Sequence, residues 1–382
     1  MRRSSLLLFA LLFAFGCGDS GGVAPGGTGG TGTGGTSDGG DGGTGASDGG
    51  TGGDAGSDMG EMPAPELSLV EDVLYVGRFD DSDPGEVLLS WSGSGFVIRF
   101  RGTSAQATFR GGRLFTVVVD GEEQPAPLEV SNDVVRSYDL ATDLPDGEHT
   151  IEVYRRTEAA NGPTVVGAVV VDGEPLSVSR PTRQLEIVGD SWSTGVAVDD
   201  ANGLCDFRSE DHFASWGSIA ARALDAELST VAWGGRGVIR GPMSEVYDRV
   251  VGTEAGSTGT IRPVDAVLVS LGANDFTDGE LPSEFVSGYV ALLEQIRRQH
   301  PDALIGCIWP ELPDASETAI ARAAIDEAVA ERVTAGDDQV MGAALELEEL
   351  VDLACDDYHP GAETHALMAD KTIAFLKAEL GW

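Results

Sequence analysis

Basic residues are scarce in this chain of 382 residues. Only 24 lysines and arginines stand against 63 acidic residues, which gives a formal charge of −39. A surface this acidic repels phosphate backbones and anionic lipid headgroups, so we expect no nucleic-acid partner. Apolar residues still make up 41% of the chain, which is enough to form a sizeable core.

Cysteine and the usual metal-binding motifs are also rare. Apart from Cys17 near the N-terminus, the chain has only Cys205, Cys307 and Cys355, which allow one disulfide with three possible pairings. No Cys-x-x-Cys occurs, and no His-x-x-x-His lies beside a cysteine. The glycines at 235 and 237 lack the third glycine of a dinucleotide fingerprint. We therefore expect neither a metal site nor a cofactor.

Long apolar runs are confined to the N-terminus. Arg2 and Arg3 precede the apolar stretch 6–15, which is too short to span a bilayer as a helix. Cys17 follows at once, in a sequence that resembles a bacterial lipobox. We predict a signal peptide over residues 1–17 and a lipid on Cys17. The protein would then be an extracytoplasmic monomer that touches an inner or outer membrane only through this anchor; the alternative is plain secretion.

The rest of the chain divides by composition. Residues 18–64 are expected to be a disordered linker, because 21 glycines fall among the 45 residues 18–62 and little apolar surface is available for burial. Residues 65–180 predict a β-sandwich of the jelly-roll type, because short, partly alternating runs are separated by turn residues. The expected strands are 87–91, 96–100, 105–109, 114–119 and 150–154.

The pattern changes after residue 180. Residues 181–382 alternate apolar strands with amphipathic helices, which predicts a three-layer α/β/α domain around a parallel sheet. In such sheets, functional sites lie at the carboxyl ends of the strands. The expected strands are 185–188, 229–233, 265–271 and 303–309, and the expected helices are 212–226, 283–299, 314–334 and 361–380.

Four short blocks follow these strands or precede the last helix. They contain Ser191 in Gly-Asp-Ser, Gly235 in Trp-Gly-Gly-Arg-Gly, Asn274 in Gly-Ala-Asn-Asp, and His359 in Asp-Asp-Tyr-His-Pro. A serine hydroxyl needs a base within hydrogen-bond reach to act as a nucleophile. Because Ser191 ends a strand and His359 stands on a loop before a helix, we predict that they are the nucleophile and the base. The other four histidines, listed here, are expected to be structural: His149, His212, His300 and His365.

The remaining roles follow from the chemistry of ester cleavage. The base needs an orienting group, and Asp356 and Asp357 both precede it closely; either one is alternatively a helix cap. Negative charge on the carbonyl oxygen needs donors, for which the candidates are the backbone N–H groups of Ser191 and Gly235 and the side chain of Asn274.

The order of serine, glycine, asparagine and histidine blocks resembles that of the SGNH hydrolase superfamily. Further stretches resemble carbohydrate esterase family 2, namely Tyr154–Glu158, Ile187–Ser191, Ser218–Leu224, Ala232–Val238, Leu271–Asp275 and Asp357–Pro360. This resemblance implies a jelly roll joined to an SGNH domain, and an esterase that removes acetyl groups from acetylated polysaccharides such as xylan or mannan. It favours Asp357 as the orienting acid, although some members use a backbone carbonyl.

Some features leave alternatives open. Gly234 replaces the serine usual in the family, and Trp192 begins an unusual sequence after the nucleophile. Trp192 and Trp309 are candidate sugar-binding residues, with a place in the core as the alternative. A non-catalytic carbohydrate-binding protein is a second interpretation, and an esterase acting on peptidoglycan, capsule or lipid esters is a third.

Overall fold

The computed structural model describes residues 66–382, except 70, 200–204, 278, 310, 311, 313, 344, 346, 348, 349 and 355–357. The predicted signal peptide with Cys17 and the predicted linker therefore lie outside the described residues. So do Cys355, Asp356 and Asp357. All described residues belong to one compact unit. Among the described helices, none combines the length and the apolar character needed to cross a membrane.

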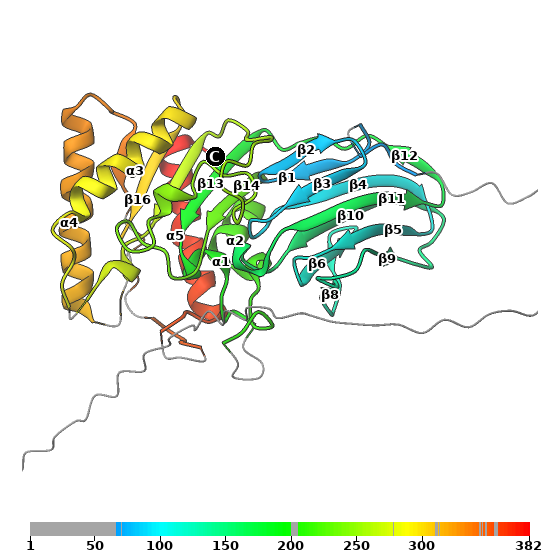
Figure 1. Cartoon of the computed structure of the whole chain (residues 1–382), viewed down its shortest axis with the longest axis horizontal. Helices are drawn as coiled ribbons and strands as arrows, with labels where there is room; N and C mark the ends of the chain where they lie inside the picture. Colours follow the sequence, from blue (N-terminus) through cyan, green and yellow to red (C-terminus); the bar gives the residue numbers. More distant parts are fainter. Residues whose placement is uncertain are drawn as a thin grey trace, which may run out of the picture. The chain divides into compact units, whose positions relative to one another are not determined.

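The first part of the chain forms two antiparallel sheets (Figure 1). One sheet has the order β1-β4-β10-β6-β7, with β12 paired to β4 and β8 paired to β6. Its strands are β1 (Leu74–Val76), β4 (Gly95–Gly102), β6 (Leu114–Val119), β7 (Glu122–Glu123), β8 (Leu128–Glu129), β10 (Gly147–Arg155) and β12 (Glu174–Leu176). The other has the order β2-β3-β11-β5-β9. Its strands are β2 (Phe79–Asp83), β3 (Glu86–Leu89), β5 (Ala105–Arg110), β9 (Arg136–Ala141) and β11 (Thr164–Val171).

Alternating residues of the two sheets form a shared core. On β10, His149, Ile151 and Val153 are buried while their neighbours are more exposed, as the period of a half-buried strand requires. Phe96 and Phe109, one from each sheet, stack with ring centroids 5.9 Å apart. This arrangement confirms the predicted β-sandwich.

The second part is a parallel sheet covered on both faces. Its order is β14-β13-β15-β16-β17. The strands are β13 (Arg183–Gly189), β14 (Ala226–Ala232), β15 (Ala266–Ser270), β16 (Leu304–Ile308) and β17 (Val340–Gly342). The α-helices are α1 (Ser191–Thr194), α2 (Trp216–Ala223), α3 (Phe285–Gln299), α4 (Ala315–Thr334) and α5 (Ala362–Leu380). The 3-10 turns are η1 (Ala159–Asn161), η2 (His212–Ala214), η3 (Met243–Glu245) and η4 (Ala273–Asp275).

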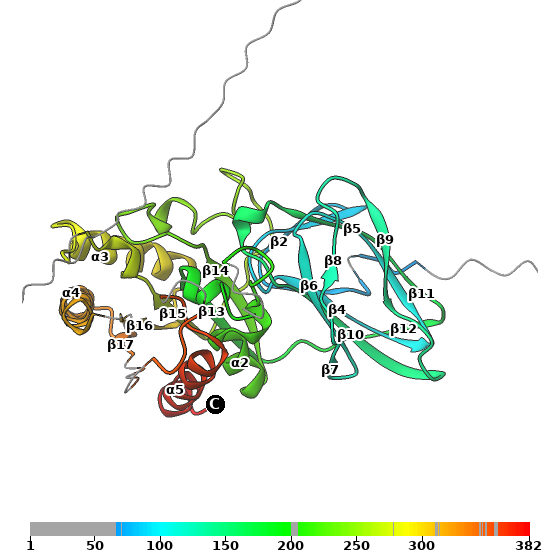
Figure 2. The ribbon, with the colours of Figure 1, turned by 90° about the horizontal axis from the view of Figure 1, so that it is seen from below.

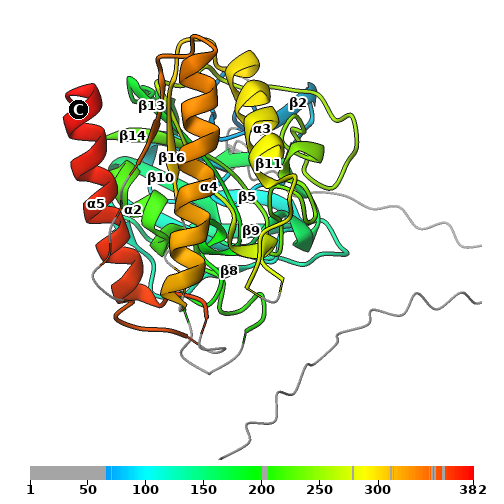
Figure 3. The same cartoon turned by 90° about the vertical axis from the view of Figure 1, so that its left-hand side faces the viewer.

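The helices divide between the faces of this sheet. Helices α2 and α5 lie on one face, and α3 and α4 lie on the other (Figures 2 and 3). Ile187 of β13 packs with the first pair and Val188 with the second, because successive side chains of a strand point to opposite faces. The predicted three-layer α/β/α domain is confirmed.

One expected helix differs from the structure. The stretch predicted as a helix over 212–226 is a 3-10 turn followed by α2, because Ser215 between them has an extended backbone with φ −73° and ψ 156°. His212 in the turn is buried, and its Nε2 lies 2.9 Å from the Thr230 hydroxyl. The contact between His212 and Thr230 on β14 therefore fixes the 3-10 turn, and α2 begins only at Trp216.

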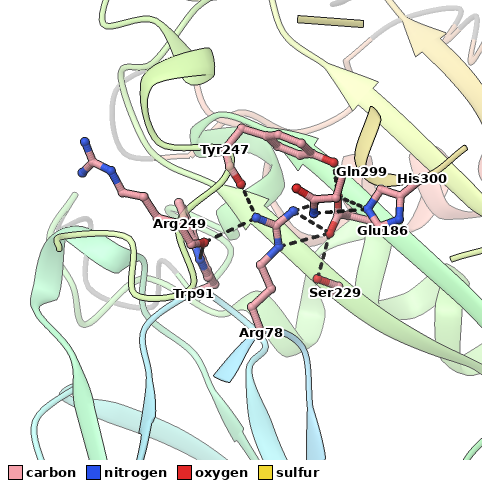
Figure 4. Close-up of polar contacts among 8 residues, drawn as sticks. All are labelled: Arg78, Trp91, Glu186, Ser229, Tyr247, Arg249, Gln299 and His300. Carbon is pink, nitrogen blue, oxygen red and sulfur yellow. Dashed lines mark hydrogen bonds and ion pairs between the residues drawn. The ribbon is translucent and has the colours of Figure 1, made fainter. Parts of the chain in front are cut away.

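A buried ion pair joins the sandwich to the parallel sheet. Arg78, between β1 and β2, contacts Glu186 in the middle of β13 at 3.0 Å, and both side chains are 1% exposed (Figure 4). The carboxylate also accepts hydrogen bonds from the hydroxyls of Tyr247 and Ser229, at 2.8 and 3.2 Å. His300 Nε2 lies 3.3 Å from the same group. The two halves of the unit are therefore linked through a charge pair that water does not reach.

The cysteines behave differently from one another. Cys205 is disulfide-bonded, whereas Cys307 on β16 is free and fully buried. Cys307 therefore takes no part in the disulfide. This excludes two of the three possible cysteine pairings, namely those that involve Cys307.

Candidate active site

The candidate nucleophile lies on a tight turn at the end of β13. Gly189 ends the strand, and a side chain there would meet the Ser193 hydroxyl at 2.1 Å. Asp190 then caps the single turn of α1 by accepting a hydrogen bond from the N–H of Trp192 at 3.1 Å. Gly195 ends the turn with φ +81°, a conformation that glycine adopts without strain. Ser191 is thereby held at the first position of α1.

The predicted base is in place beside this serine. His359 Nε2 lies 2.9 Å from Ser191 Oγ, across 168 residues of sequence. The carbonyl of His359 accepts a hydrogen bond from Ala354 N–H at 2.8 Å, and Leu353 pairs with Pro360. These contacts fix the loop that carries the imidazole. Asp356 and Asp357, the predicted orienting acids, lie outside the described residues, and their role stays a prediction.

Asp352 caps the N-terminal end of the last helix. The Asp352 carboxylate accepts hydrogen bonds from the N–H groups of Glu363 and Thr364, at 3.0 and 2.8 Å, in the first turn of α5. It also accepts one from the Thr364 hydroxyl at 2.7 Å. The helix that follows His359 is therefore capped from the same loop.

Two backbone donors face the same region. Within the described residues, the N–H groups of Ser191 and Gly235 donate to no protein acceptor. Gly235 is exposed and has φ +76°, which turns the chain at the end of β14. Because β14 pairs with β13 up to Gly189–Ala232, both donors lie at the same edge of the sheet. This geometry suits an oxyanion hole.

Asn274 reaches the site but is already engaged. Its side-chain amide donates to Asp190 Oδ2 at 3.2 Å and to the Arg236 carbonyl at 2.9 Å. A third donor role requires the substrate oxygen to replace one of these acceptors, and it stays a prediction. The next residue, Asp275, is buried and accepts from three N–H groups, those of Val238, Ile239 and Arg240. It therefore braces the loop after Gly235.

The two predicted sugar-binding tryptophans belong to the core. Trp192 is 5% exposed and Trp309 is 6% exposed, and each packs in a hydrophobic cluster of the parallel-sheet domain. A stacking platform needs a free ring face, so the core alternative describes both residues better. Tyr358, which the sequence interpretation left out, is only partly buried and lies edge-on to His359, with ring centroids 5.4 Å apart.

Burial shapes the electrostatics beside the nucleophile. The Asp190 carboxyl is fully enclosed, and burial raises its pKa to about 7; the charge of Asp275 adds to the rise, and the N–H of Trp192 opposes it. Asp190 can thus hold a proton near neutral pH while it bridges Trp192 and Asn274.

The other histidines each have partners elsewhere. His149 binds Asp120 and the Pro145 carbonyl, and His365 Nδ1 accepts from Trp216 N–H at 3.1 Å. His212 and His300 contact Thr230 and Glu186, as described above. Only His359 meets a serine hydroxyl among the histidine contacts of the described residues.

Comparison with known proteins matches both halves of the chain. Residues 75–179 match the family Carbohydrate esterase 2 N-terminal, and residues 187–367 match the GDSL-like Lipase/Acylhydrolase family. A cellulase/esterase CelE from Acetivibrio thermocellus is 31% identical over 81% of this chain, which spans 40% of that protein. An acetylxylan esterase / glucomannan deacetylase from Cellvibrio japonicus is 25% identical over 61% of this chain and 70% of its own.

A solved structure shows the same architecture. The structure of a family two carbohydrate esterase from Clostridium thermocellum in complex with cellohexaose is 28% identical, with a TM-score of 0.76, and the match covers 81% of this chain and 99% of that one. The sandwich, the parallel sheet and the serine–histidine contact together have the architecture of the SGNH type. The chain thus carries matches to the N-terminal model of carbohydrate esterase family 2 and to the GDSL-like family, and its relatives are carbohydrate esterases.

Proposed function

We propose that this protein is a serine esterase that removes O-acetyl groups from polysaccharides such as xylan or mannan. The observation that carries the proposal is the 2.9 Å contact between Ser191 Oγ and His359 Nε2. The N–H groups of Ser191 and Gly235, which donate to no acceptor among the described parts of the chain, support it. The names of the relatives support the substrate class, and the chain spans only about two fifths of the CelE protein.

The geometry supports a two-step mechanism. His359 takes the hydroxyl proton as Ser191 Oγ attacks the acetyl carbonyl, and the carbonyl oxygen becomes an anion. The N–H groups of Ser191 and Gly235 stabilise that anion. His359 then gives the proton to the sugar oxygen as the bond between that oxygen and the acetyl carbon breaks, which frees the sugar hydroxyl and leaves an acetyl-enzyme. Water, deprotonated by His359, attacks the acetyl group and releases acetate.

The proposal is tested by acetate release. We expect the purified protein to release acetate from acetylated xylan or glucomannan and to cleave an aryl acetate. Ser191→Ala lowers kcat by at least about 10⁴-fold, because the covalent step is lost. Ser193→Ala, two residues further along the same turn, is the matched control and keeps its activity. Undiminished turnover by Ser191→Ala would refute the assignment.

Two other functions give different results in the same assays. A carbohydrate-binding protein without catalysis retains the polysaccharide and releases no acetate. A lipid esterase accepts long acyl chains, whereas a site shaped for acetate rejects chains of about six or more carbons because of steric overlap. A series of aryl esters of increasing chain length separates acetate from lipid substrates, and a panel of acetylated glycans, peptidoglycan included, identifies the polymer.

We also propose that the protein is lipid-anchored outside the cytoplasm. The support is the basic and apolar N-terminus followed by Cys17. Metabolic labelling with a radioactive fatty acid should mark the full chain but not a Cys17→Ser variant. Label on the variant, or none on the wild type, would favour plain secretion.

A further inference from the structure

Glu158 is a carboxylate from the sandwich that enters the candidate active site. It lies between β10 and β11, immediately before η1. Its Oε2 accepts a hydrogen bond from Gly234 N–H at 2.6 Å, across 76 residues. Gly234 directly precedes Gly235, whose N–H is a proposed oxyanion donor. The sandwich therefore holds the peptide next to that donor.

The backbone around Glu158 is fixed from two directions. Arg155 is fully buried, and its guanidinium donates to the carbonyls of Thr157 and Glu158, at 2.9 and 2.7 Å. The N–H of Glu158 donates to the Glu210 carboxylate at 2.6 Å. Glu210 also accepts from the Asn161 amide at 3.3 Å. A carboxylate on so constrained a loop can hold a partner in place with little loss of side-chain entropy.

The shape of Gly234 fits this carboxylate. A Cβ at Gly234 would lie 2.9 Å from Glu158 Oε2, closer than real Cβ atoms normally approach. Gly234 has no positive φ, so a side chain added there would crowd the carboxylate and not strain the backbone. A substitution at Gly234 therefore displaces Glu158 Oε2.

Charges on several elements meet at Glu158. Burial raises the pKa of its carboxyl, while the Gly234 N–H, the Arg155 guanidinium and the charge of His359 oppose the rise. Burial and the charge of Glu158 raise the pKa of the Glu210 carboxyl to about 7. His359 in turn influences His365 on α5 and contacts Ser191 and Tyr358.

We propose that Glu158 is a positioning residue of the esterase site: it fixes the oxyanion loop by accepting a hydrogen bond from Gly234 N–H. The inference rests on the proposed esterase function. Two substitutions test this role. Glu158→Ala removes the acceptor, whereas Glu158→Gln keeps an oxygen that can accept from Gly234 N–H.

The first test is steady-state kinetics on an aryl acetate. Glu158→Ala lowers kcat by roughly 10²-fold, as expected when an oxyanion donor is misplaced, and changes KM by less than about threefold. Glu158→Gln loses about tenfold or less, because its amide oxygen can still accept from Gly234 N–H. Glu227→Gln, a buried carboxylate at the other end of β14, is the matched control and keeps the wild-type kcat.

The second test couples Glu158 to Gly234. Gly234→Ala crowds the carboxylate and lowers kcat in the wild-type background, but has little further effect in Glu158→Ala. Equal effects of Gly234→Ala in both backgrounds would overturn the proposal. So would folded Glu158 variants with wild-type kcat. If Glu158→Ala melts at a much lower temperature than the wild type, the proposed role of Glu158 is judged from Glu158→Gln and from the Gly234→Ala cycle.

A third readout separates this inference from the proposed function. The rate at which a fluorophosphonate modifies Ser191 depends on the base and the oxyanion donors but not on the natural substrate. We expect this rate to rank the variants in the same order as their kcat values do. A wild type that reacts with the fluorophosphonate but releases no acetate overturns the proposed substrate, while the variant rates still judge Glu158. A wild type inert to both reagents overturns both proposals.

Discussion

Replacing Glu186 by glutamine removes the charge that faces Arg78 in the interior of the protein. Arg78 donates to both oxygens of Glu186, at 3.0 and 3.1 Å through its Nη2, and also to the carbonyl of Tyr247. The guanidinium is 1% exposed, so water cannot replace the lost carboxylate. The variant therefore keeps a buried cation without its counter-ion (Figure 4).

The size of the effect follows from this burial. Breaking a buried ion pair by removing one partner costs about 3–5 kcal/mol, because an uncompensated charge remains. An exposed pair is worth under about 1 kcal/mol. Glu148, which is 43% exposed and paired with Arg99 and Arg101, is the matched control. Replacing both Arg78 and Glu186 by apolar residues removes the orphaned charge, so the double variant should lose less than the sum of the single losses.

Urea unfolding at pH 7 followed by tryptophan fluorescence measures these differences in the free energy of unfolding.

The pH dependence of the difference between the wild type and Glu186→Gln gives a second measurement. Burial tends to raise the pKa of Glu186, but Arg78, His300 and Tyr247 together hold it well below the usual carboxyl range. Its contribution to stability is therefore present above the usual carboxyl pKa and is lost as pH falls toward the lowered one. The wild type and Glu186→Gln should converge in acid. A loss under about 1 kcal/mol for Glu186→Gln at pH 7 would refute the reasoning.

Two further predictions concern buried titratable groups. The pKa of Asp190 is raised to about 7 by burial, so wild-type stability relative to Asp190→Asn should be greatest below the usual carboxyl pKa and should fall as pH rises toward about 7. Thermal unfolding of both proteins from pH 4 to 8 measures this, and parallel curves would contradict it. Burial raises the pKa of the Cys307 thiol to about 12, so Ellman's reagent should leave Cys307 untouched at pH 8 in the folded protein and modify it in guanidinium. Modification at equal rates in both states would show that the thiol is accessible.

The parallel-sheet half is readily predicted because its signals are local. The strands β13, β15 and β16 are short apolar runs that are buried on both faces, and α3 repeats its buried residues at helical spacing. The strands of the sandwich are harder to predict from the sequence. The strand β9 is polar and mostly exposed at a sheet edge, and β11 contains a register shift against β5, so neither gives a regular alternation.

In the site, too, residues marked by their neighbouring sequence are predictable, whereas contacts between distant segments are not. Ser191 and His359 are recognisable because each stands on a distinctive turn, and the structure brings them together. Glu158 lies in a stretch that matched the family, but no local pattern shows that its side chain reaches Gly234, 76 residues away. The burial of Trp192 and Trp309 likewise depends on packing between elements, which composition does not reveal.

The contact between Glu158 and Gly234 limits how such proteins can exchange parts. A chimera with its breakpoint near residue 180 would take the carboxylate from one parent and the oxyanion loop from the other. Productive recombination should therefore transfer residues 154–162 together with 232–238, even though the two segments lie in different halves of the gene.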